Sequence, residues 1–255
     1  MNNSIARPVI GFVEYIGKLA STLASALSYI ARLAIDWRLT FFQMSSMGIN
    51  SIPIVLLIVS FTGMIISLQV TEQAIRFGTK QFIGGGIAFV MVRELAPVLS
   101  AVAMAGRVGS SMASELASMK VSEQIDALRA LATNPVQYLV VPRMLALIIM
   151  IPAVTIISGL AGIMAAYWIA YMAGGVTWPV FFRYIPKLLH PGDVTAALIK
   201  SGVFAVTIAL IGCTEGMHAE GGAQGVGRAT TNSVVASIVS IFGLNYLLSM
   251  LLFRP

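Results

Sequence analysis

Residues 144–182 read MLALIIMIPAVTIISGLAGIMAAYWIAYMAGGVTWPVFF and contain no Asp, Glu, Lys or Arg. Residues 39–71 and residues 229–253 are also free of these four residue types. A transmembrane helix needs about 20 consecutive apolar residues, so each stretch is long enough to cross a bilayer. Because no water-soluble fold tolerates such runs, the sequence predicts an integral membrane protein whose surroundings are lipid.

The composition of the 255-residue chain agrees, since 58% of its residues are apolar, 10% are charged and its mean hydropathy is +0.89. A soluble domain has about 25% charged residues. The net charge of +6 is compatible with nucleic-acid binding, but the basic residues flank apolar runs, which favours anchoring at the membrane surface. The single cysteine, Cys213, excludes an intrachain disulfide and a cysteine-rich metal site. We expect it to pack inside a span.

Residues 12–33 have the pattern of an amphipathic helix, with large apolar side chains every three or four positions. A short first span is the alternative, but Glu14, Lys18 and Arg32 would be costly inside a membrane. We therefore expect this helix to lie in the membrane interface. No pattern of a cleaved signal peptide is found, so insertion would depend on the internal spans. The apolar positions are Phe12, Ile16, Leu19, Leu23, Leu27, Ile30 and Leu33.

Five transmembrane spans are predicted after this helix, which makes the fold all-α. Their approximate limits are residues 48–74, 87–117, 138–170, 194–213 and 229–253. An odd number of spans argues against the two-fold repeats of many secondary transporters. The chain is interpreted as a single membrane domain over residues 1–255, in which an N-terminal cytoplasmic or interfacial segment (1–45) precedes a five-span bundle (46–255).

The basic residues predict the orientation of the bundle. A cytoplasmic N-terminus places more of them inside than outside, so the positive-inside rule favours a cytoplasmic N-terminus and a C-terminus on the other side. The inside residues would be Arg7, Lys18, Arg32, Arg38, Lys120, Arg129, Arg143 and Arg228, and the outside residues Arg76, Lys80, Arg183, Lys187 and Arg254.

Small residues recur at every fourth position in two of the spans. The second span has Ala101, Ala105, Gly109, Ala113 and Ala117, and the third has Gly162, Ala166, Ala170 and Gly174. Small side chains let helix backbones approach closely in a membrane. We expect both stripes to mark helix packing, within the subunit or between subunits.

Charged residues inside a span are candidates for function because they are costly in lipid. Arg93 and Glu94 lie within the second span, and Pro97 removes the N–H that would bond the Arg93 carbonyl, so it is expected to kink the helix. Helical neighbours point about 100° apart, so the two side chains should face different partners or a wet cavity. Lys200 in the fourth span is the expected partner of Glu94. The alternatives are a purely structural ion pair, and for Lys200 an extension to the lipid headgroups.

The most polar segment lies between the second and third spans, at residues 120–131. Ser122 is expected to cap a short helix and Asn134-Pro135 to end it. Ile125, Leu128 and Leu131 would share one face, and a short helix of this kind suits docking in a partner's groove. A solvated amphipathic loop is the alternative. The candidate docking residues are Glu123, Gln124, Ile125, Asp126, Leu128 and Arg129.

Residues 215–228 are rich in glycine and are expected to form a loop, with Thr230 and Thr231 capping the fifth span. The Gly-Lys-Ser/Thr ending of a phosphate-binding loop is absent from this segment. His218 with Glu215 and Glu220 offers too few ligands, at an unspecific spacing, for a metal site. No nucleophile elbow or HExxH motif is present, so the sequence predicts no catalytic residues, no metal and no cofactor in this chain.

Several of these motifs, taken together and in order, resemble the MlaE family of permeases. They cover the chain from the second span to the fifth. The matching residues are Arg93-Glu94-Leu95-Ala96-Pro97-Val98, Ala105-Gly106-Arg107-Val108-Gly109-Ser110, Glu115, Ser122-Glu123-Gln124-Ile125-Asp126-Ala127-Leu128, Asn134-Pro135, Pro142-Arg143, Gly221-Gly222-Ala223, Gly225-Val226-Gly227-Arg228-Ala229-Thr230-Thr231 and Val234-Val235.

The resemblance implies a homodimeric permease of an ABC transporter in the bacterial inner membrane that moves phospholipids or related lipids. It implies two cytoplasmic ATPase subunits, which would bind and hydrolyse ATP with magnesium, a lipid-binding MCE-domain protein and in some systems a STAS-domain subunit. In that picture the helix at 123–131 looks like the coupling helix that docks on the ATPase. Arg93, Glu94 and Lys200 look like charges near the lipid pathway.

Two other classes of function remain open on the sequence. One is an intramembrane enzyme that modifies lipids with Glu94 as general acid or base, which would need a nucleophile or metal nearby. The other is a passive membrane scaffold whose charges only hold the spans together. The glycine-rich segment looks closer to branches of the family outside the enterobacterial type. The lipid, the direction of transport and the choice between a bacterial and a plastid membrane therefore stay open.

Overall fold

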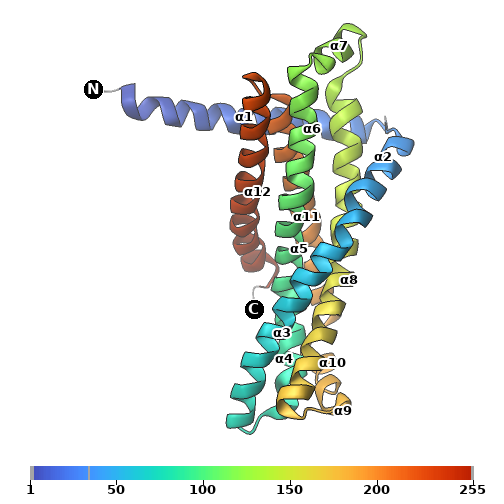
Figure 1. The fold of residues 1–255 in the computed structure, drawn as a ribbon, viewed down its shortest axis with the longest axis vertical. Helices are drawn as coiled ribbons and strands as arrows, with labels where there is room; N and C mark the ends of the chain where they lie inside the picture. Colours follow the sequence, from blue (N-terminus) through green and yellow to red (C-terminus); the bar gives the residue numbers. More distant parts are fainter. Residues whose placement is uncertain (1–2, 34, 254–255) are drawn as a thin grey trace.

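The computed structural model describes the backbone of residues 3–33 and 35–253, and the side chains of all of these except residues 3–9 and 12. Within these ranges the chain is almost entirely helical, without a strand, and five helices are long and apolar enough to cross a membrane (Figure 1). The predicted all-α membrane fold is confirmed. Arg254 from the orientation argument lies outside the described residues, as do the side chains of Arg7 and Phe12.

Several of the spans are built from more than one helical segment. The first joins α2 (Trp37–Gln43), the π-helical turn η1 (Met44–Gly48), the 3-10 turn η2 (Ile49–Ser51) and α3 (Ile52–Arg76). The second joins η3 (Lys80–Phe82), α4 (Ile83–Val90), η4 (Met91–Leu95), α5 (Ala96–Met104), η5 (Ala105–Gly109) and α6 (Ser110–Val121). The third joins η6 (Val136–Val140) and α8 (Val141–Gly174), the fourth is α11 (Pro191–Met217) and the fifth is α12 (Gly222–Leu252).

Four further helices lie outside the spans and define the two ends of the bundle. They are α1 (Asn3–Ala31), α7 (Gln124–Ala130), α9 (Trp178–Phe182) and α10 (Ile185–Leu188). Figure 1 places α1 and α7 at one end, called the α1 end below, and α9 and α10 at the other, called the α9 end. The helix α12 starts at the α1 end and finishes beside the middle of the other spans.

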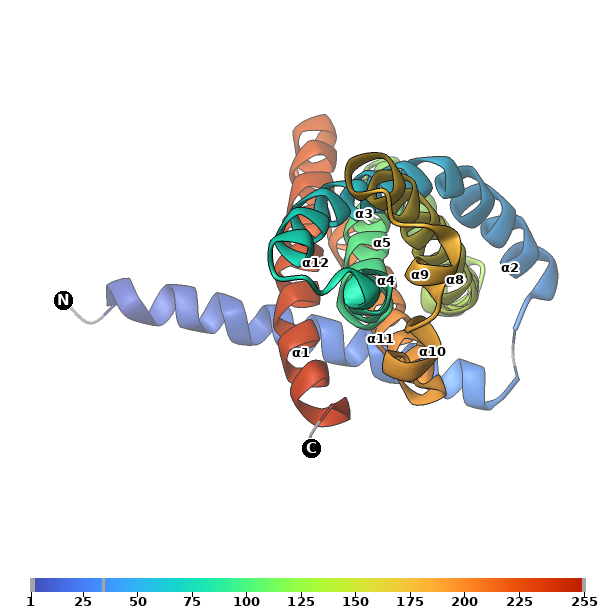
Figure 2. The ribbon, with the colours of Figure 1, turned by 90° about the horizontal axis from the view of Figure 1, so that it is seen from below.

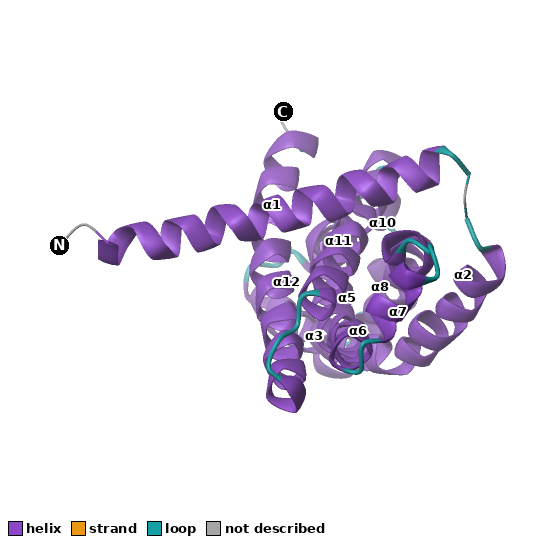
Figure 3. Ribbon diagram, turned by 90° about the horizontal axis from the view of Figure 1, so that it is seen from above, coloured by secondary structure: helices purple, strands orange, loops and turns teal. Residues whose placement is uncertain are grey.

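The N-terminal helix α1 lies across the α1 end of the bundle instead of running parallel to the spans (Figure 1). Figures 2 and 3 look along the bundle from its two ends, and in both α1 extends sideways past α12. Thr22 and Ala26 are buried where α1 packs on the bundle, while Ile16 and Leu27 stay exposed. This geometry fits a helix in the membrane interface, with apolar side chains left for lipid.

The spans are longer than the sequence predicted. The first reaches Arg76 and the second begins at Lys80, so both continue past the charge-free run. An apolar run marks only the part of a helix inside the hydrocarbon, and the helical backbone continues into the interface where charges are solvated. The limits drawn from hydropathy are therefore too short at both ends of the first four spans and at the N-terminal end of the fifth.

The small-residue stripes lie at close contacts between helices. A Cβ at Gly63 of α3 would overlap the carbonyl oxygen of Gly162 in α8, and Ser67 Oγ donates to the Ala166 carbonyl at 2.6 Å. In the second span, Gly109 accepts a hydrogen bond from Ser233 Oγ of α12 at 3.2 Å. The remaining members of that stripe, Ala101, Ala105, Ala113 and Ala117, are fully buried.

The predicted glycine-rich loop at residues 215–228 is wrong, because most of it is helical. Only residues 218–221 lie between α11 and α12, and Gly221 and Gly222 have φ values of 91° and 64°. Two glycines in left-handed conformations close the turn in a few residues. Thr230 and Thr231 therefore lie inside α12, where their hydroxyls donate to the carbonyls four residues earlier, and they do not cap it.

Candidate functional site

Arg93 and Glu94 lie in η4, a π-helical turn in the second span. Such turns are frequent at functional sites. Pro97 follows in the first turn of α5 and lacks the N–H that would bond the Arg93 carbonyl oxygen. The side-chain amine of Lys200 donates to that oxygen instead, at 3.1 Å. The backbone carbonyl that Pro97 leaves without a helical hydrogen bond is thus bonded by a side chain of the fourth span.

Lys200 is fully buried between three spans. Its Nζ lies 2.9 Å from Glu94 Oε1 and 2.7 Å from Ser249 Oγ of α12. The side chain has 0% exposure, so it does not extend to the lipid headgroups. Burial of an unpaired ammonium would be very costly, and the three oxygen partners offset that cost.

Glu94 has further partners on α12. Its Oε2 accepts from Asn245 Nδ2 at 3.1 Å, and Ser249 Oγ lies 3.0 Å from Oε1. The Glu94 side chain remains 35% exposed. Glu94 is therefore held by protein groups on one side and accessible from outside the protein on the other.

Arg93 faces a different set of groups, as expected for helical neighbours. Its Nη1 lies 3.6 Å from Asp193 Oδ1, and its guanidinium sits over the rings of Phe253 and Phe89 at 3.4 and 4.9 Å from their centroids. Asp193 also accepts a hydrogen bond from the His190 backbone N–H at the start of α11. Cation–π contacts of this kind stabilise a cation away from water.

Arg93, Glu94, Asp193 and Lys200 are called the charge cluster below. Two positive and two negative groups give it no net formal charge. An apolar cavity of about 240 Å³ is lined in part by Val92 and Val194, the sequence neighbours of Arg93 and Asp193, but the four charged side chains are not among its lining residues. Paired charges and an apolar cavity therefore lie close to each other along the second and fourth spans.

The second candidate region is α7, the part of the molecule farthest from the α9 end (Figure 1). Ser122 was expected to cap it, but Ser122 Oγ donates to the Ser118 carbonyl at 2.7 Å and closes α6. Only two residues separate the helices, and the sharp reversal puts Glu123 in a left-handed conformation, with φ 60°. Ser122 is therefore not in the position to cap α7.

The side chains of α7 divide into two groups. Ile125 is buried and Leu128 is partly buried against the bundle, whereas Leu131 is exposed beyond the end of the helix, so these three do not share one face. Asp126 is held by Lys120 and Arg129, at 2.7 and 2.9 Å. Donation from Lys120 is the main cause of a lowered pKa for the Asp126 carboxyl. Glu123, Gln124 and Arg129 are the exposed polar side chains of this segment.

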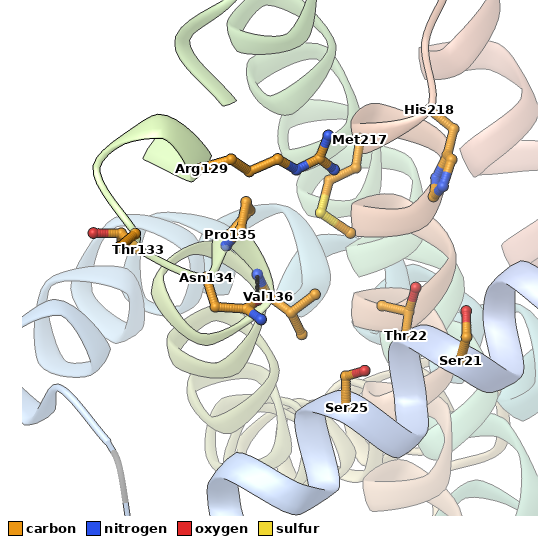
Figure 4. A pocket seen from close by; sticks show the side chains of 11 residues that line it. Ser21, Thr22, Ser25, Arg129, Thr133, Asn134, Pro135, Val136, Met217 and His218 are labelled. Atoms are coloured by element: carbon orange, nitrogen blue, oxygen red, sulfur yellow. Dashed lines mark hydrogen bonds between the residues drawn. The ribbon is translucent and has the colours of Figure 1, made fainter. Parts of the chain in front are cut away.

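A cavity of about 490 Å³, lined by both polar and apolar residues, separates α7 from α1. Figure 4 shows Ser21, Thr22 and Ser25 of α1 on one side and Arg129 and Thr133 on the other. Asn134 closes the connection to α8 by accepting from the Val136 N–H at 2.9 Å. The helix α7 is thus attached to the bundle through Ile125 and Leu128 and has open space on its α1 side.

The family model described as Permease MlaE matches residues 40–251, which contain the charge cluster and α7. The chain belongs to the MlaE permease family. It is an integral membrane protein of the ABC transporter permease class, and the match begins after α1 and ends in α12.

Curated relatives of this MlaE permease are similar over most of its length. A probable ABC transporter permease protein of Synechocystis sp. is 42% identical over 89% of this chain and 86% of its own. A probable ABC transporter permease protein of Rickettsia felis is 36% identical over 99% of this chain and 97% of its own. Protein TRIGALACTOSYLDIACYLGLYCEROL 1, chloroplastic, of Arabidopsis thaliana is 37% identical over 86% of this chain and 63% of its own.

The MlaE permease structure adds partners that the sequence reasoning missed. Asn245 and Ser249 lie in a span that was read only as apolar, and Asp193 lies at the start of a helix. One signal was available, because Ser233, Ser237, Asn245 and Ser249 fall on one every-fourth stripe of α12. Such a stripe predicts a polar helix face, although it does not identify the span that it meets.

Proposed function

We propose that this MlaE permease moves a phospholipid or a related lipid through the membrane, driven by ATP that a partner subunit hydrolyses. The observation that carries the proposal is the charge cluster beside the apolar cavity. A zwitterionic or anionic headgroup can exchange with the internal ion pairs while an acyl chain occupies apolar space. Because the cluster has no net formal charge and breaking a buried ion pair is costly, a headgroup would have to replace an existing pair with one of its own.

The proposed assembly is a homodimer in the bacterial inner membrane, with its N-terminus cytoplasmic and its C-terminus periplasmic. In this assembly α7 docks on a cytoplasmic ABC ATPase, with Glu123, Gln124 and Arg129 toward the partner, and the cavity beside α1 gives α7 room to shift. The second copy would pack on α12, which is the least buried of the five spans in the described chain and exposes Val239, Tyr246 and Leu251. An MCE-domain protein would exchange lipid at the α9 end, and a STAS-domain subunit can complete the complex.

The chemical class of the lipid is the open part of the proposal. The name of the Arabidopsis relative refers to trigalactosyldiacylglycerol, a glycolipid without phosphate. Phospholipids fit the charge cluster better, because a phosphate can pair with Arg93, which is partly exposed and only 3.6 Å from its carboxylate partner Asp193. The direct comparison is between a phospholipid and a galactolipid of the same acyl chains.

An enzyme that modifies lipids is disfavoured by the bonding around Glu94. Ser249 is the one hydroxyl bonded to it among the described residues, and Lys200 also bonds that hydroxyl. A Ser–Lys catalytic pair needs a neutral lysine as base, whereas Lys200 is paired with Glu94. The proposal therefore assigns these groups to binding.

Reconstitution tests the proposed function. The permease and its partner ATPase are placed in proteoliposomes with a fluorescent phospholipid, and transfer to acceptor vesicles is followed with ATP or a non-hydrolysable analogue. We expect transfer only with ATP, with the phospholipid faster than the galactolipid. A modified lipid detected by mass spectrometry would indicate the enzyme instead, and neither transfer nor product would indicate the scaffold.

A further inference from the structure

A polar pocket in the first and second spans is not explained by the proposed transport mechanism. It has a volume of about 490 Å³ and lies between the η1–η2 region and the η5–α6 region. Arg107 is its central cation, and Gln43, Ser46, Asn50, Ser111 and Glu115 provide polar groups around it. It is called the Arg107 pocket below.

The Arg107 pocket lies below the level of the interfacial helix α1. Thr22 of α1 and Met217 at the end of α11 both line the cavity between α1 and α7, so the end of α11 lies level with α1. Gly216, next to Met217, touches Leu116 of α6. Arg107 precedes Leu116 by nine residues, which places it about 13 Å further along the helix, toward the middle of the bundle. A charge at that depth is costly in lipid and requires a polar partner.

Few protein groups bond the Arg107 side chain. Arg107 Nη1 donates to the carbonyl oxygen of Asn50, and within residues 3–33 and 35–253 no carboxylate forms an ion pair with it. Glu115 is nearby, but its Oε1 lies 2.8 Å from Nη2 of Arg143, a side chain with 4% exposure. Because Glu115 is paired with Arg143, which does not line the pocket, Arg107 is the cation of the pocket that lacks a carboxylate partner among the described residues.

The pocket walls have unused hydrogen-bonding groups. Across the described part of the chain, the side chains of Gln43, Ser46 and Ser111 have no hydrogen-bond partner. Each of them can donate a hydrogen bond, and arginine binds phosphate through two parallel N–H groups. Phe42 also lines the pocket and is 65% exposed, so it offers an apolar surface beside the polar groups. A phosphate joined to acyl chains fits both the polar groups and this apolar surface.

We propose that the Arg107 pocket binds the phosphate of a membrane phospholipid from the leaflet at the α1 end. Arg107 pairs with the phosphate, the hydroxyls of Ser46 and Ser111 donate to its oxygens, and the acyl chains leave past Phe42 into the bilayer. The site lies on different helical turns from the charge cluster. It requires only that the chain lies in a membrane, so its binding can be measured without transport.

Native mass spectrometry of the purified full chain in detergent tests this inference. The probes are dioleoylphosphatidylglycerol, dioleoylglycerol, which has the same acyl chains without the phosphate, and inorganic phosphate as competitor. Arg107→Gln is compared with Arg76→Gln, which changes an exposed arginine at the α9 end that pairs with Glu72. Ser111→Leu fills the pocket from an exposed position and keeps Arg107, so it serves if Arg107→Gln does not fold.

We expect Arg107→Gln and Ser111→Leu to weaken phosphatidylglycerol binding by about tenfold, the typical effect of losing a charge-assisted hydrogen bond. Arg76→Gln should bind as the unchanged chain does, and dioleoylglycerol should bind weakly to all variants. Equal phosphatidylglycerol binding by both pocket variants and the unchanged chain would overturn the inference. So would displacement of the lipid by millimolar phosphate, or a change of oligomeric state with lipid binding intact, which would identify a protein contact instead.

Discussion

The charge cluster and α7 both contain carboxylates paired with basic side chains, but the pairs have different origins. In α7, Asp126 bonds Lys120 and Arg129, which are six and three residues away. In the charge cluster, Glu94 bonds Lys200 and, 155 residues away, Ser249. The first arrangement is local and solvated, whereas the second holds three spans together at a buried position. Removing an ion pair should therefore lower stability in the charge cluster, whereas in α7 it should weaken coupling to the partner.

The largest expected effect follows from removing the buried cation. Lys200→Met leaves Glu94 without its ammonium partner and should lower the free energy of unfolding by about 3 kcal/mol, the lower end for a buried pair, because Glu94 is 35% exposed and keeps its bonds to Asn245 and Ser249. The loss of stability is measured by heating the protein in detergent and monitoring the folded fraction by size-exclusion chromatography. The double variant Glu94→Gln with Lys200→Met removes both charges and should recover much of the loss. If the double variant loses as much stability as Lys200→Met and Glu94→Gln lose when measured separately and summed, the two charges are not coupled.

Ser249→Ala should have an intermediate effect. Its hydroxyl bonds both Lys200 and Glu94, and hydrogen bonds to charged groups contribute about 1.5 to 3 kcal/mol. Ser240→Ala on the same helix is the matched control, because the Ser240 side chain has no hydrogen-bond partner among the described residues. Equal unfolding midpoints for the two variants would mean that Ser249 does not support the cluster.

Asp126→Asn should lower the unfolding midpoint only slightly while it weakens communication with the ATPase. Exposed ion pairs contribute little to stability. The pairs of Asp126 with Lys120 and Arg129 instead fix the orientation of α7. The measurement is lipid-stimulated ATPase activity of the reconstituted complex, which should fall toward its basal rate. Glu72→Gln removes a similar exposed pair at the α9 end and should keep full stimulation. Normal stimulation in Asp126→Asn would remove α7 from the coupling route.

The smallest expected effect is a dependence on pH. The pKa of Asp126 is lowered when folded, so its contribution to stability is present above the ordinary carboxyl pKa of about 3.9 and is lost as the pH falls through the lowered value. The small difference between the unchanged chain and Asp126→Asn should be constant from pH 7 to about pH 5. It should disappear only in stronger acid. A change between pH 7 and pH 6 would point to another group.

The same contrast explains what could be predicted from the sequence. Hydropathy gave the five spans, and local pattern gave α1 and α7, because these features depend on neighbouring residues. The partners Asp193, Asn245 and Ser249 depend on how spans pack, which no local pattern encodes. The proposed capping by Ser122, Thr230 and Thr231 was wrong because helix ends shift by several residues when a tight turn or a glycine pair closes the chain.

The most direct test of the charge cluster's role in lipid movement is phospholipid transfer by the double variant Glu94→Gln with Lys200→Met. This variant lacks both charges without leaving one unpaired, so its fold and its bound ATPase should be retained. If the cluster handles the headgroup, ATP-driven transfer in proteoliposomes should fall at least tenfold. Transfer at the rate of the unchanged chain would contradict that role and leave the ion pair as a structural contact alone.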